Sequence, residues 1–319
     1  MKTIAISEHQ ADVIAMMERL GPDAHEYSVI NDLVNSITDD DQAKEFRELI
    51  QPILNENTLY GYTYLKPMGY AGDYMLIEKM YQQYASDDPR WHKWDVYYHT
   101  HEACKAVRNR KSYFVQLMEN LIALRLQPVR VLILGSGPAS DVNEFFERNP
   151  NAAVSFDLLD IDQRAIDYAS NKNIKYNDRI NYIKMNVLRF MPTDKYDLIW
   201  SAGLFDYLND RYFVGLLNRF KNNLNPYAEM VIGNFSDNNP TRRVMEVIGQ
   251  WYLLHRSSQK LTQLAINAGI ADNAIYVDQE PLGINLFLRI KPDFEYTKPQ
   301  VNIYRHTETA KLQQLDEVL

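Results

Sequence analysis

Three short segments of the sequence have the residue types of a nucleotide-binding site. The first is G-S-G at 135–137, whose glycines let the backbone turn sharply and approach a ligand without a Cβ in the way. The second is Asp160, a carboxylate that can accept hydrogen bonds from both hydroxyls of an adenosine ribose, unless it caps the following helix instead. The third is Asn186, whose amide can bond an adenine amino group or form a turn at a strand end.

A second set of residues lies downstream and could serve the reaction of a bound molecule. His255 could deprotonate a hydroxyl or amine, or it could be a packing residue. Asp206 is a second candidate for catalysis, because it follows a run of small residues at 201–203 that leaves room for a ligand. The candidate substrate contacts around these two residues are Phe205, Tyr207, Asn234, Trp251, Tyr252 and Arg256, the last of which could bind an acidic group.

The tyrosine-rich segment 60–74, Y-G-Y-T-Y-L-K-P-M-G-Y-A-G-D-Y, is a further candidate for contact with a ligand. Tyr70 and its neighbours could face a cation through their rings, or they could form a packing seam between two domains. Arg108 and Arg110 could hold a carboxylate in a bidentate fork, or they could lie on a solvated helix face. Two residues apart on one helix, they cannot both face a cleft squarely.

The elements that must position these residues alternate between strand and helix from Val129 onward. The run V-R-V-L-I-L at 129–134 is typical of a strand buried on both faces. Further strands are predicted at 153–159, 180–185, 196–202, 228–235, 274–278 and 285–290, with helices at 139–148, 162–174 and 210–224. Such alternation predicts an α/β fold with a parallel, doubly wound sheet. The turn between the last two strands is too short for a parallel crossover, so these two are predicted to pair antiparallel.

The pattern divides the chain into three parts. Residues 1–125 show helical spacing throughout, and Leu126-Gln127-Pro128 is a plausible boundary. Residues 126–292 contain the seven predicted strands, with a helical insertion at about 240–269 that would include Trp251 and Arg256. Residues 293–319 form a polar tail.

Composition narrows the class of partner. The net charge of −8 disfavours the phosphate backbone of nucleic acids as the main partner. The single cysteine, Cys104, excludes an internal disulfide and a zinc site of several cysteines, and no metal is expected. No apolar run is long enough to span a membrane, and the first residues do not resemble a signal peptide, so we expect a cytoplasmic protein. Whether it is a monomer or a homodimer stays open.

Together, the glycine loop, Asp160, Asn186 and the closing antiparallel strands resemble the class I S-adenosylmethionine-dependent methyltransferase family. The resemblance implies a Rossmann-like seven-stranded sheet whose final strand is antiparallel. We interpret residues 1–125 as an all-helical lid domain, because methyl transfer requires the reactants to be positioned and water to be excluded. It covers about 160 residues and departs from the family where Ser140 replaces a third glycine. Segments 66–74, 106–110 and 251–257 are similar to bacterial methyltransferases linked to 3-hydroxy fatty acid methyl ester signalling.

The resemblance implies S-adenosylmethionine as cofactor and S-adenosylhomocysteine as product. The residues expected to bind the cofactor are Gly135, Ser136, Gly137, Asp160, Ile161, Asn186, Val187, Ser201, Ala202, Gly203, Tyr70 and Arg110, and those expected in catalysis are Tyr70, Asp206 and His255. The predicted reaction is methyl transfer to a small molecule, at a carboxylate or hydroxyl oxygen. The alternatives are a small-molecule N-methyltransferase, an NAD-binding protein with a Rossmann-like fold, and a non-catalytic protein of that fold.

Overall fold

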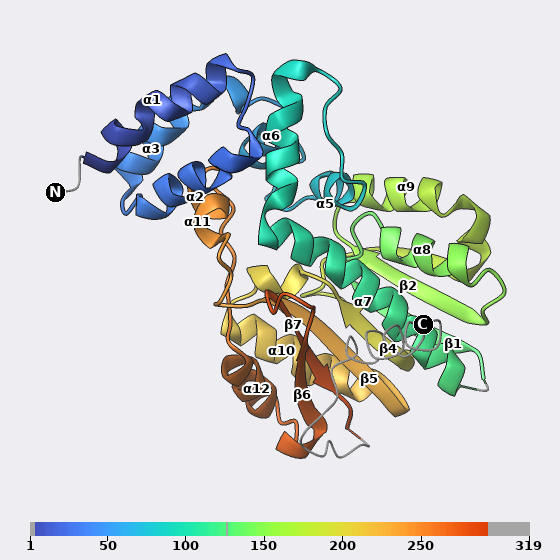
Figure 1. Ribbon diagram of the computed structural model, residues 1–319. Helices are drawn as coiled ribbons and strands as arrows, with labels where there is room; N and C mark the ends of the chain where they lie inside the picture. Colours follow the sequence, from blue (N-terminus) through green and yellow to red (C-terminus); the bar gives the residue numbers. More distant parts are fainter. Residues whose placement is uncertain (1–3, 126, 293–319) are drawn as a thin grey trace, which may run out of the picture. The chain divides into compact units, whose positions relative to one another are not determined.

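Seven strands between residues 129 and 290 form one mixed sheet (Figure 1). The computed structural model describes residues 4–125 and 127–292. Its sheet has the order β3-β2-β1-β4-β5-β7-β6, in which β7 is antiparallel to both of its neighbours. The strands are β1 (Val129–Leu134), β2 (Val154–Asp160), β3 (Ile180–Lys184), β4 (Tyr196–Ser201), β5 (Leu224–Phe235), β6 (Ile275–Gln279) and β7 (Asn285–Ile290). The predicted α/β sheet with its antiparallel end is confirmed.

Successive side chains along the strands point to opposite faces of the sheet, so a separate hydrophobic core lies on each face. On β1, Val131 and Ile133 face a core shared with α7, α8 and α9, whereas Leu132 and Leu134 face a core shared with α10 and α12. These helices are α7 (Glu102–Leu124), α8 (Ser140–Arg148), α9 (Gln163–Lys172), α10 (Asp210–Phe220) and α12 (Ser258–Asn267). The order of strands reverses direction between β1 and β4, and such a switch point opens a crevice at the carboxyl ends of the strands.

The first unit is helical and comprises described residues 4–108 and 239–252. Its helices are α1 (Ile4–Glu18), α2 (Tyr27–Ser36), α3 (Asp40–Leu49), α4 (Leu59–Leu65), α5 (Tyr74–Tyr81), α6 (Pro89–Thr100) and α11 (Arg242–Val247), together with the start of α7. Asp39, Thr58, Asp73 and Asp88 each accept a backbone N–H at a helix start, which explains where α3 to α6 begin. In the core of this unit the Tyr60 hydroxyl lies 2.6 Å from His101 Nε2, and burial lowers the pKa of His101 to about 3.

The unit boundaries differ from those expected at 125 and 126. One lies between Arg108 and Asn109, inside the continuous helix α7, because the later turns of α7 pack Tyr113 and Phe114 into a core of the sheet. The predicted polar tail, 293–319, lies outside the described residues.

The expected helical insertion at 240–269 was wrong as one element. It consists of α11, a connector without helix at 250–257, and α12. Residues 239–252 belong to the helical unit, where Arg47 donates to the carbonyl of Val247 at 2.7 Å and Arg243 to that of Ile37 at 2.5 Å. Trp251, Tyr252, His255 and Arg256 were expected on a helix and lie instead on the connector, because contacts far apart in the sequence set its path.

Among the described residues, no helix is long and apolar enough to cross a membrane. The same part of the chain contains no group of three or more histidine, cysteine, aspartate or glutamate side chains that could hold a metal ion.

Candidate cofactor and acceptor site

The glycine loop connects the end of β1 to the start of α8. Gly135 and Gly137 have φ angles of +70° and +54°, which only glycine adopts without strain. The N–H groups of Gly135 and Ser136 donate to the carbonyl of Leu159 at 2.9 and 3.1 Å. A Cβ on Gly135 would lie 3.0 Å from the Cβ of Leu204. The loop is therefore held tightly between the end of β2 and the turn after β4. Its close approach to a ligand stays a prediction.

Asp160, the last residue of β2, holds the loop through its carboxylate. One oxygen accepts the N–H of Gly137 at 2.8 Å, and the other accepts the N–H of Asp162 at 3.0 Å. Burial raises the pKa of Asp160, against these hydrogen bonds. Asp162 caps α9 by accepting the N–H of Arg164. The backbone of Ile161 also hydrogen-bonds to this carboxylate. Two carboxylate oxygens offer about four lone-pair sites, so capacity remains for a ribose hydroxyl. Ile161 is exposed beside it.

Asn186 and Val187 follow β3. The Asn186 side-chain oxygen accepts the N–H of Leu188 at 2.8 Å, so this residue does form the turn that was weighed as its alternative role. Val187 is buried, and its carbonyl accepts a bond from Arg219 at 3.2 Å. The contact with adenine stays a prediction for both residues.

The small residues after β4 permit close backbone approach. Ser201 is buried and its hydroxyl donates to the carbonyl of Leu134 at 2.9 Å, so it links β4 to β1. A Cβ on Gly233 would lie 2.1 Å from the carbonyl oxygen of Ala202. Glycine at this position therefore allows the ends of β4 and β5 to approach closely. A Cβ on Gly203 would lie 2.7 Å from Arg110 Nη1. The guanidinium of Arg110 therefore lies directly against the backbone of Gly203.

Arg110 is a buried cation, only 6% exposed, and its Nε has no hydrogen-bond partner within the described ranges. The hydroxyl of Ser136, in the glycine loop, is likewise buried without a partner there. Buried donors of this kind are costly unless a ligand satisfies them. Arg108 is different, because it donates to the Cys104 sulfur at 3.2 Å within the helical unit. The two arginines separate as helical spacing predicted, and Arg110 is the one with a free donor.

Asp206 lies in the short turn Leu204–Tyr207 after β4 and is 2% exposed. One carboxylate oxygen accepts the N–H of Phe235 at 2.7 Å. Burial raises the pKa of Asp206 to about 7, although the nearby charges of Arg110 and Arg256 act in the opposite direction. A carboxyl with this pKa exchanges its proton near neutrality and can act as a general base.

Asp141 is a second buried carboxyl near Arg110, and sequence reasoning missed it. It lies in the first turn of α8, and burial raises its pKa to about 6 against the charges of Lys111 and Arg110. Its place at a helix start, directly after the glycine loop, gave it the ordinary pattern of a first-turn acid. Only its burial distinguishes it.

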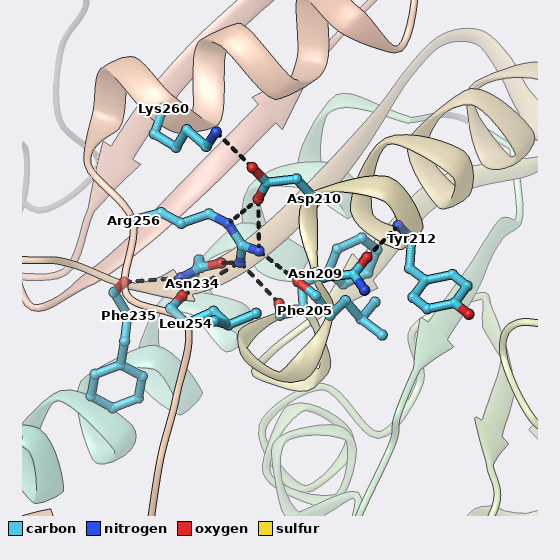
Figure 2. A network of polar contacts seen from close by, with 10 residues as sticks. Phe205, Asn209, Asp210, Tyr212, Asn234, Phe235, Leu254, Arg256 and Lys260 are labelled. Atoms are coloured by element: carbon cyan, nitrogen blue, oxygen red, sulfur yellow. Dashed lines mark hydrogen bonds and ion pairs between the residues drawn. The ribbon is translucent and has the colours of Figure 1, made fainter. Parts of the chain in front are cut away.

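The unit that contains the sheet comprises described residues 109–125, 127–238 and 253–292 and is called the catalytic unit from here on. Three of the expected substrate contacts are part of its fold. Phe205 is fully buried and packs edge-on against Phe213, with ring centroids 4.9 Å apart. Asn234 is also fully buried, and its amide nitrogen donates to the carbonyls of Phe235 and Leu254. Arg256 bonds to its surroundings with all of its nitrogens, as Figure 2 shows. These contacts hold the three side chains within the fold, and their contact with a substrate stays a prediction.

The remaining expected residues fall in different units. Tyr207 in the catalytic unit and Tyr252 in the helical unit are exposed, whereas Trp251 is buried in the helical unit. His255, in the catalytic unit, is half-buried, and its Nδ1 lies 3.1 Å from the carbonyl of Leu253. A role for His255 as a base stays a prediction.

Tyr70 lies in the loop between α4 and α5 of the helical unit. Gly69 and Gly72 flank it with φ angles of +87° and +65°. Lys66, at the start of the loop, donates from Nζ to the carbonyl of Gly249 at 3.1 Å. The loop is thus built around left-handed turns and anchored at its start, and Tyr70 is 38% exposed on it.

Comparisons with known proteins support this description of the catalytic unit. Residues 131–227 match the family model described as a methyltransferase domain. No curated protein matches the chain. Among solved structures, a possible exported protein from Bordetella parapertussis aligns with a TM-score of 0.64 at 16% identity, over 92% of this chain and all of that one. At this identity the likeness shows a shared fold.

Two further solved structures align with TM-scores below 0.5. A putative O-methyltransferase from Nostoc punctiforme aligns at 0.45 with 15% identity, over 56% of this chain and 55% of that one. Human N-acetylserotonin methyltransferase, solved in complex with S-adenosylmethionine, aligns at 0.43 with 15% identity, over 58% and 56%.

The family model and the sheet lead to one assignment. The matched residues run from β1 into β5 and include the glycine loop and Asp160. The strand order with its antiparallel β7 is that of the same class. Residues 131–227 therefore match a methyltransferase domain, and the sheet that contains them has the fold of the class I S-adenosylmethionine-dependent methyltransferases.

Proposed function

We propose that this methyltransferase acts on an oxygen nucleophile, a hydroxyl or a carboxylate, of a small molecule. The acceptor oxygen attacks the methyl carbon in line with the C–S bond, and the bonding electron pair leaves with the sulfur as S-adenosylhomocysteine. The observation that carries the proposal is Asp206, a buried carboxyl in the turn after β4. Burial raises its pKa to about 7, and the buried Arg110 lies near it. Positioning of the reactants and exclusion of water supply most of the rate in such a displacement.

In this proposal the cofactor lies along the carboxyl ends of β1, β2 and β3. Asp160 binds the ribose hydroxyls, and Asn186 contacts the adenine. The guanidinium of Arg110 and the hydroxyl of Ser136 bind the carboxylate of the methionine part. Their support is the absence of any hydrogen-bond partner for Arg110 Nε and Ser136 Oγ among the residues described. A bound carboxylate satisfies both donors and neutralises the buried charge.

Asp206 serves the acceptor. A hydroxyl must lose its proton as the new C–O bond forms, and a carboxylate oxygen of Asp206 receives it. A carboxylate acceptor is already ionised and needs no base. A hydroxyl is therefore the acceptor that makes use of the raised pKa of Asp206.

Gly203→Ala tests the role of Arg110. The new Cβ would lie 2.7 Å from Arg110 Nη1, at the far end of a flexible side chain, so the guanidinium moves and the fold survives. We expect affinity for S-adenosylhomocysteine to fall roughly tenfold, about 1.4 kcal/mol, as one charged contact is lost. Affinity for 5′-methylthioadenosine, which lacks the amino-acid part, should stay unchanged. An equal loss for both compounds in calorimetric titrations would contradict the assignment of Arg110.

The helical unit acts in this proposal as a lid that brings Tyr70 to the sulfonium. Tyr70→Ala should then raise the KM for S-adenosylmethionine by about 2- to 30-fold, the value of a cation–π contact of about 0.5–2 kcal/mol, because the contact is made with the sulfonium charge that is lost as the methyl group leaves. Tyr70→Phe keeps the ring and should stay close to wild type. Steady-state rates of the alanine variant equal to wild type would assign the tyrosine loop to structure alone.

The acceptor class is tested by transfer of a radiolabelled methyl group from S-adenosylmethionine. The acceptors to compare are octanoate, 3-hydroxyoctanoate, phenol and catechol, with octylamine as the nitrogen nucleophile. Methylation of a hydroxyl or carboxylate compound above the rate for octylamine supports the proposal. Preferential methylation of the amine would replace it with an N-methyltransferase.

A further inference from the structure

Arg256 is the centre of a buried polar network after β4 and β5 (Figure 2). Its side chain is 4% exposed and lies on the connector between α11 and α12. Nη1 donates to the Asn234 side-chain oxygen at 2.7 Å and to the carbonyl of Phe205 at 3.2 Å. Nη2 donates to the carbonyl of Leu208 at 2.5 Å and to Asp210 at 3.2 Å. One guanidinium therefore joins the turn after β4, the end of β5 and the start of α10.

These contacts enclose Asp206 without touching its carboxylate. Phe205 and Leu208, whose carbonyls Arg256 holds, stand on either side of Asp206 in the chain. The backbone N–H of Arg256 donates to the carbonyl of Phe235 at 2.9 Å, and the N–H of Phe235 donates to the Asp206 carboxylate at 2.7 Å. Asp206 is thus fixed on its backbone and on its side chain by groups that Arg256 holds in place.

The connector itself is part of this arrangement. The N–H of Leu254 donates to the backbone carbonyl of Asp206 at 2.8 Å, and the carbonyl of Leu254 accepts from the Asn234 amide at 3.0 Å. Leu254 and Arg256 lie in the part of the connector, from residue 253 onward, that belongs to the same unit as Asp206.

The charge balance of Arg256 is unusual for a merely structural residue. Its one carboxylate partner, Asp210, has a half-exposed side chain and shares its other oxygen with Lys260 at 2.6 Å. Carbonyl dipoles provide most of the remaining compensation. Burial of a cation is costly on such terms, whereas apolar residues would fill the same space at less cost. The positive charge also lowers the pKa of Asp206, together with that of Arg110 on α7.

We propose that Arg256 is a positioning residue for methyl transfer, which holds the turn after β4 so that the Asp206 carboxylate points at the acceptor hydroxyl. The inference rests on the proposed function, since it requires Asp206 to receive a proton. Arg256 itself contacts neither cofactor nor acceptor in this account. It acts through the carbonyls of Phe205 and Leu208 and through the backbone of Phe235.

The test compares Arg256→Lys and Arg256→Met with Arg179→Lys as the matched control. Arg179 also donates to two backbone carbonyls, those of Pro150 and Ala152, but it precedes β3, an edge strand of the sheet that pairs with neither β4 nor β5. Each variant is assayed with the best of the hydroxyl probes, 3-hydroxyoctanoate, phenol or catechol. The measurements are kcat, KM, the pH dependence of kcat, S-adenosylhomocysteine affinity and thermal unfolding.

We expect Arg256→Lys to bind S-adenosylhomocysteine within about threefold of wild type while kcat falls about 10- to 100-fold, because the charge remains and the fork is lost. The acid limb of its kcat profile, the rise of kcat with pH as Asp206 ionises, should stay near that of wild type. In Arg256→Met the acid limb should move to higher pH, because a positive charge beside Asp206 is removed. Arg179→Lys should match wild type in kcat and pH profile. Folded Arg256 variants with wild-type kcat and pH profile would overturn the inference.

Asp210→Asn keeps the inference testable if the Arg256 variants do not fold, because Asp210 is half-exposed and its loss should be tolerated. Removal of this negative charge should move the acid limb to lower pH and lower kcat severalfold. An unchanged profile would overturn the inference. If the wild-type protein binds S-adenosylhomocysteine but methylates neither the hydroxyl probes nor octanoate, the proposed function fails and the inference fails with it. Methylation of octanoate alone would leave the proposed function standing and overturn the inference, because a carboxylate acceptor needs no base. An active wild type with normal Arg256 variants removes the inference alone.

Discussion

Asp206→Asn is expected to lower kcat for a hydroxyl acceptor by roughly 10²- to 10⁴-fold, the usual contribution of a positioned general base. Asparagine keeps an oxygen that can accept the Phe235 N–H, so the turn after β4 retains its hydrogen bond. What is lost is the group that receives the proton. The fold and the affinity for S-adenosylhomocysteine should therefore stay close to wild type, and the loss should appear in kcat.

The pH dependence gives this prediction its sign. Asp206 acts as a base only when ionised, so the rate with a hydroxyl acceptor should rise with pH through about 7 and then level off. Asp206→Asn should lack this acid limb. The same group affects stability. Because folding raises the pKa of Asp206, ionisation of this carboxyl destabilises the folded state. Its contribution to the free energy of unfolding is therefore present below its ordinary pKa and is lost as pH rises through about 7.

Asp278→Asn is the matched control. Asp278 is also a buried carboxyl of the catalytic unit with a raised pKa, but it accepts the Tyr113 hydroxyl at 2.9 Å and lies on β6. Its variant should keep the wild-type turnover and acid limb. An acid limb that survives unchanged in Asp206→Asn would show that another group receives the proton, and His255 would then be the next candidate.

Asp160→Ala is expected to weaken cofactor binding by about 1.5–3 kcal/mol, roughly 10- to 150-fold. The carboxylate loses its contacts with the ribose hydroxyls, and Gly137 loses the acceptor that holds the glycine loop. Asp162→Asn is the control, because Asp162 caps α9 two residues away. Calorimetry with S-adenosylhomocysteine measures both variants. Unchanged affinity in Asp160→Ala would remove the assignment of this residue to the ribose.

The sheet could be predicted because its signals are local. Strands such as β1 contain a short run of apolar, β-branched residues, and the short turn before β7 favours the antiparallel pair. Gly135 and Asp160 could be assigned for the same reason, since a residue at the end of a parallel strand has a defined place in the fold. The positive φ angles of the glycine loop agree with that placement.

The connector could not be predicted, because contacts distant in sequence determine it. The bond from Arg47 to the carbonyl of Val247 spans 200 positions, and nothing in residues 240–257 marks them as part of the helical unit. The unit boundary inside α7 has no sequence signal either, because the helix continues across it. Arg256 and Asn234 were expected at the substrate for their polarity, whereas only their burial against carbonyls indicates a different role.

The most direct test of the account is isothermal titration of the full chain with S-adenosylmethionine, S-adenosylhomocysteine and NAD in parallel. The glycine loop, Asp160 and the unpaired donor of Arg110 predict micromolar binding of the first two ligands and none of NAD. Binding of NAD without either methionine-derived ligand would contradict the account. Binding of none of the three would contradict it as well, and would indicate a non-catalytic protein that has kept the fold.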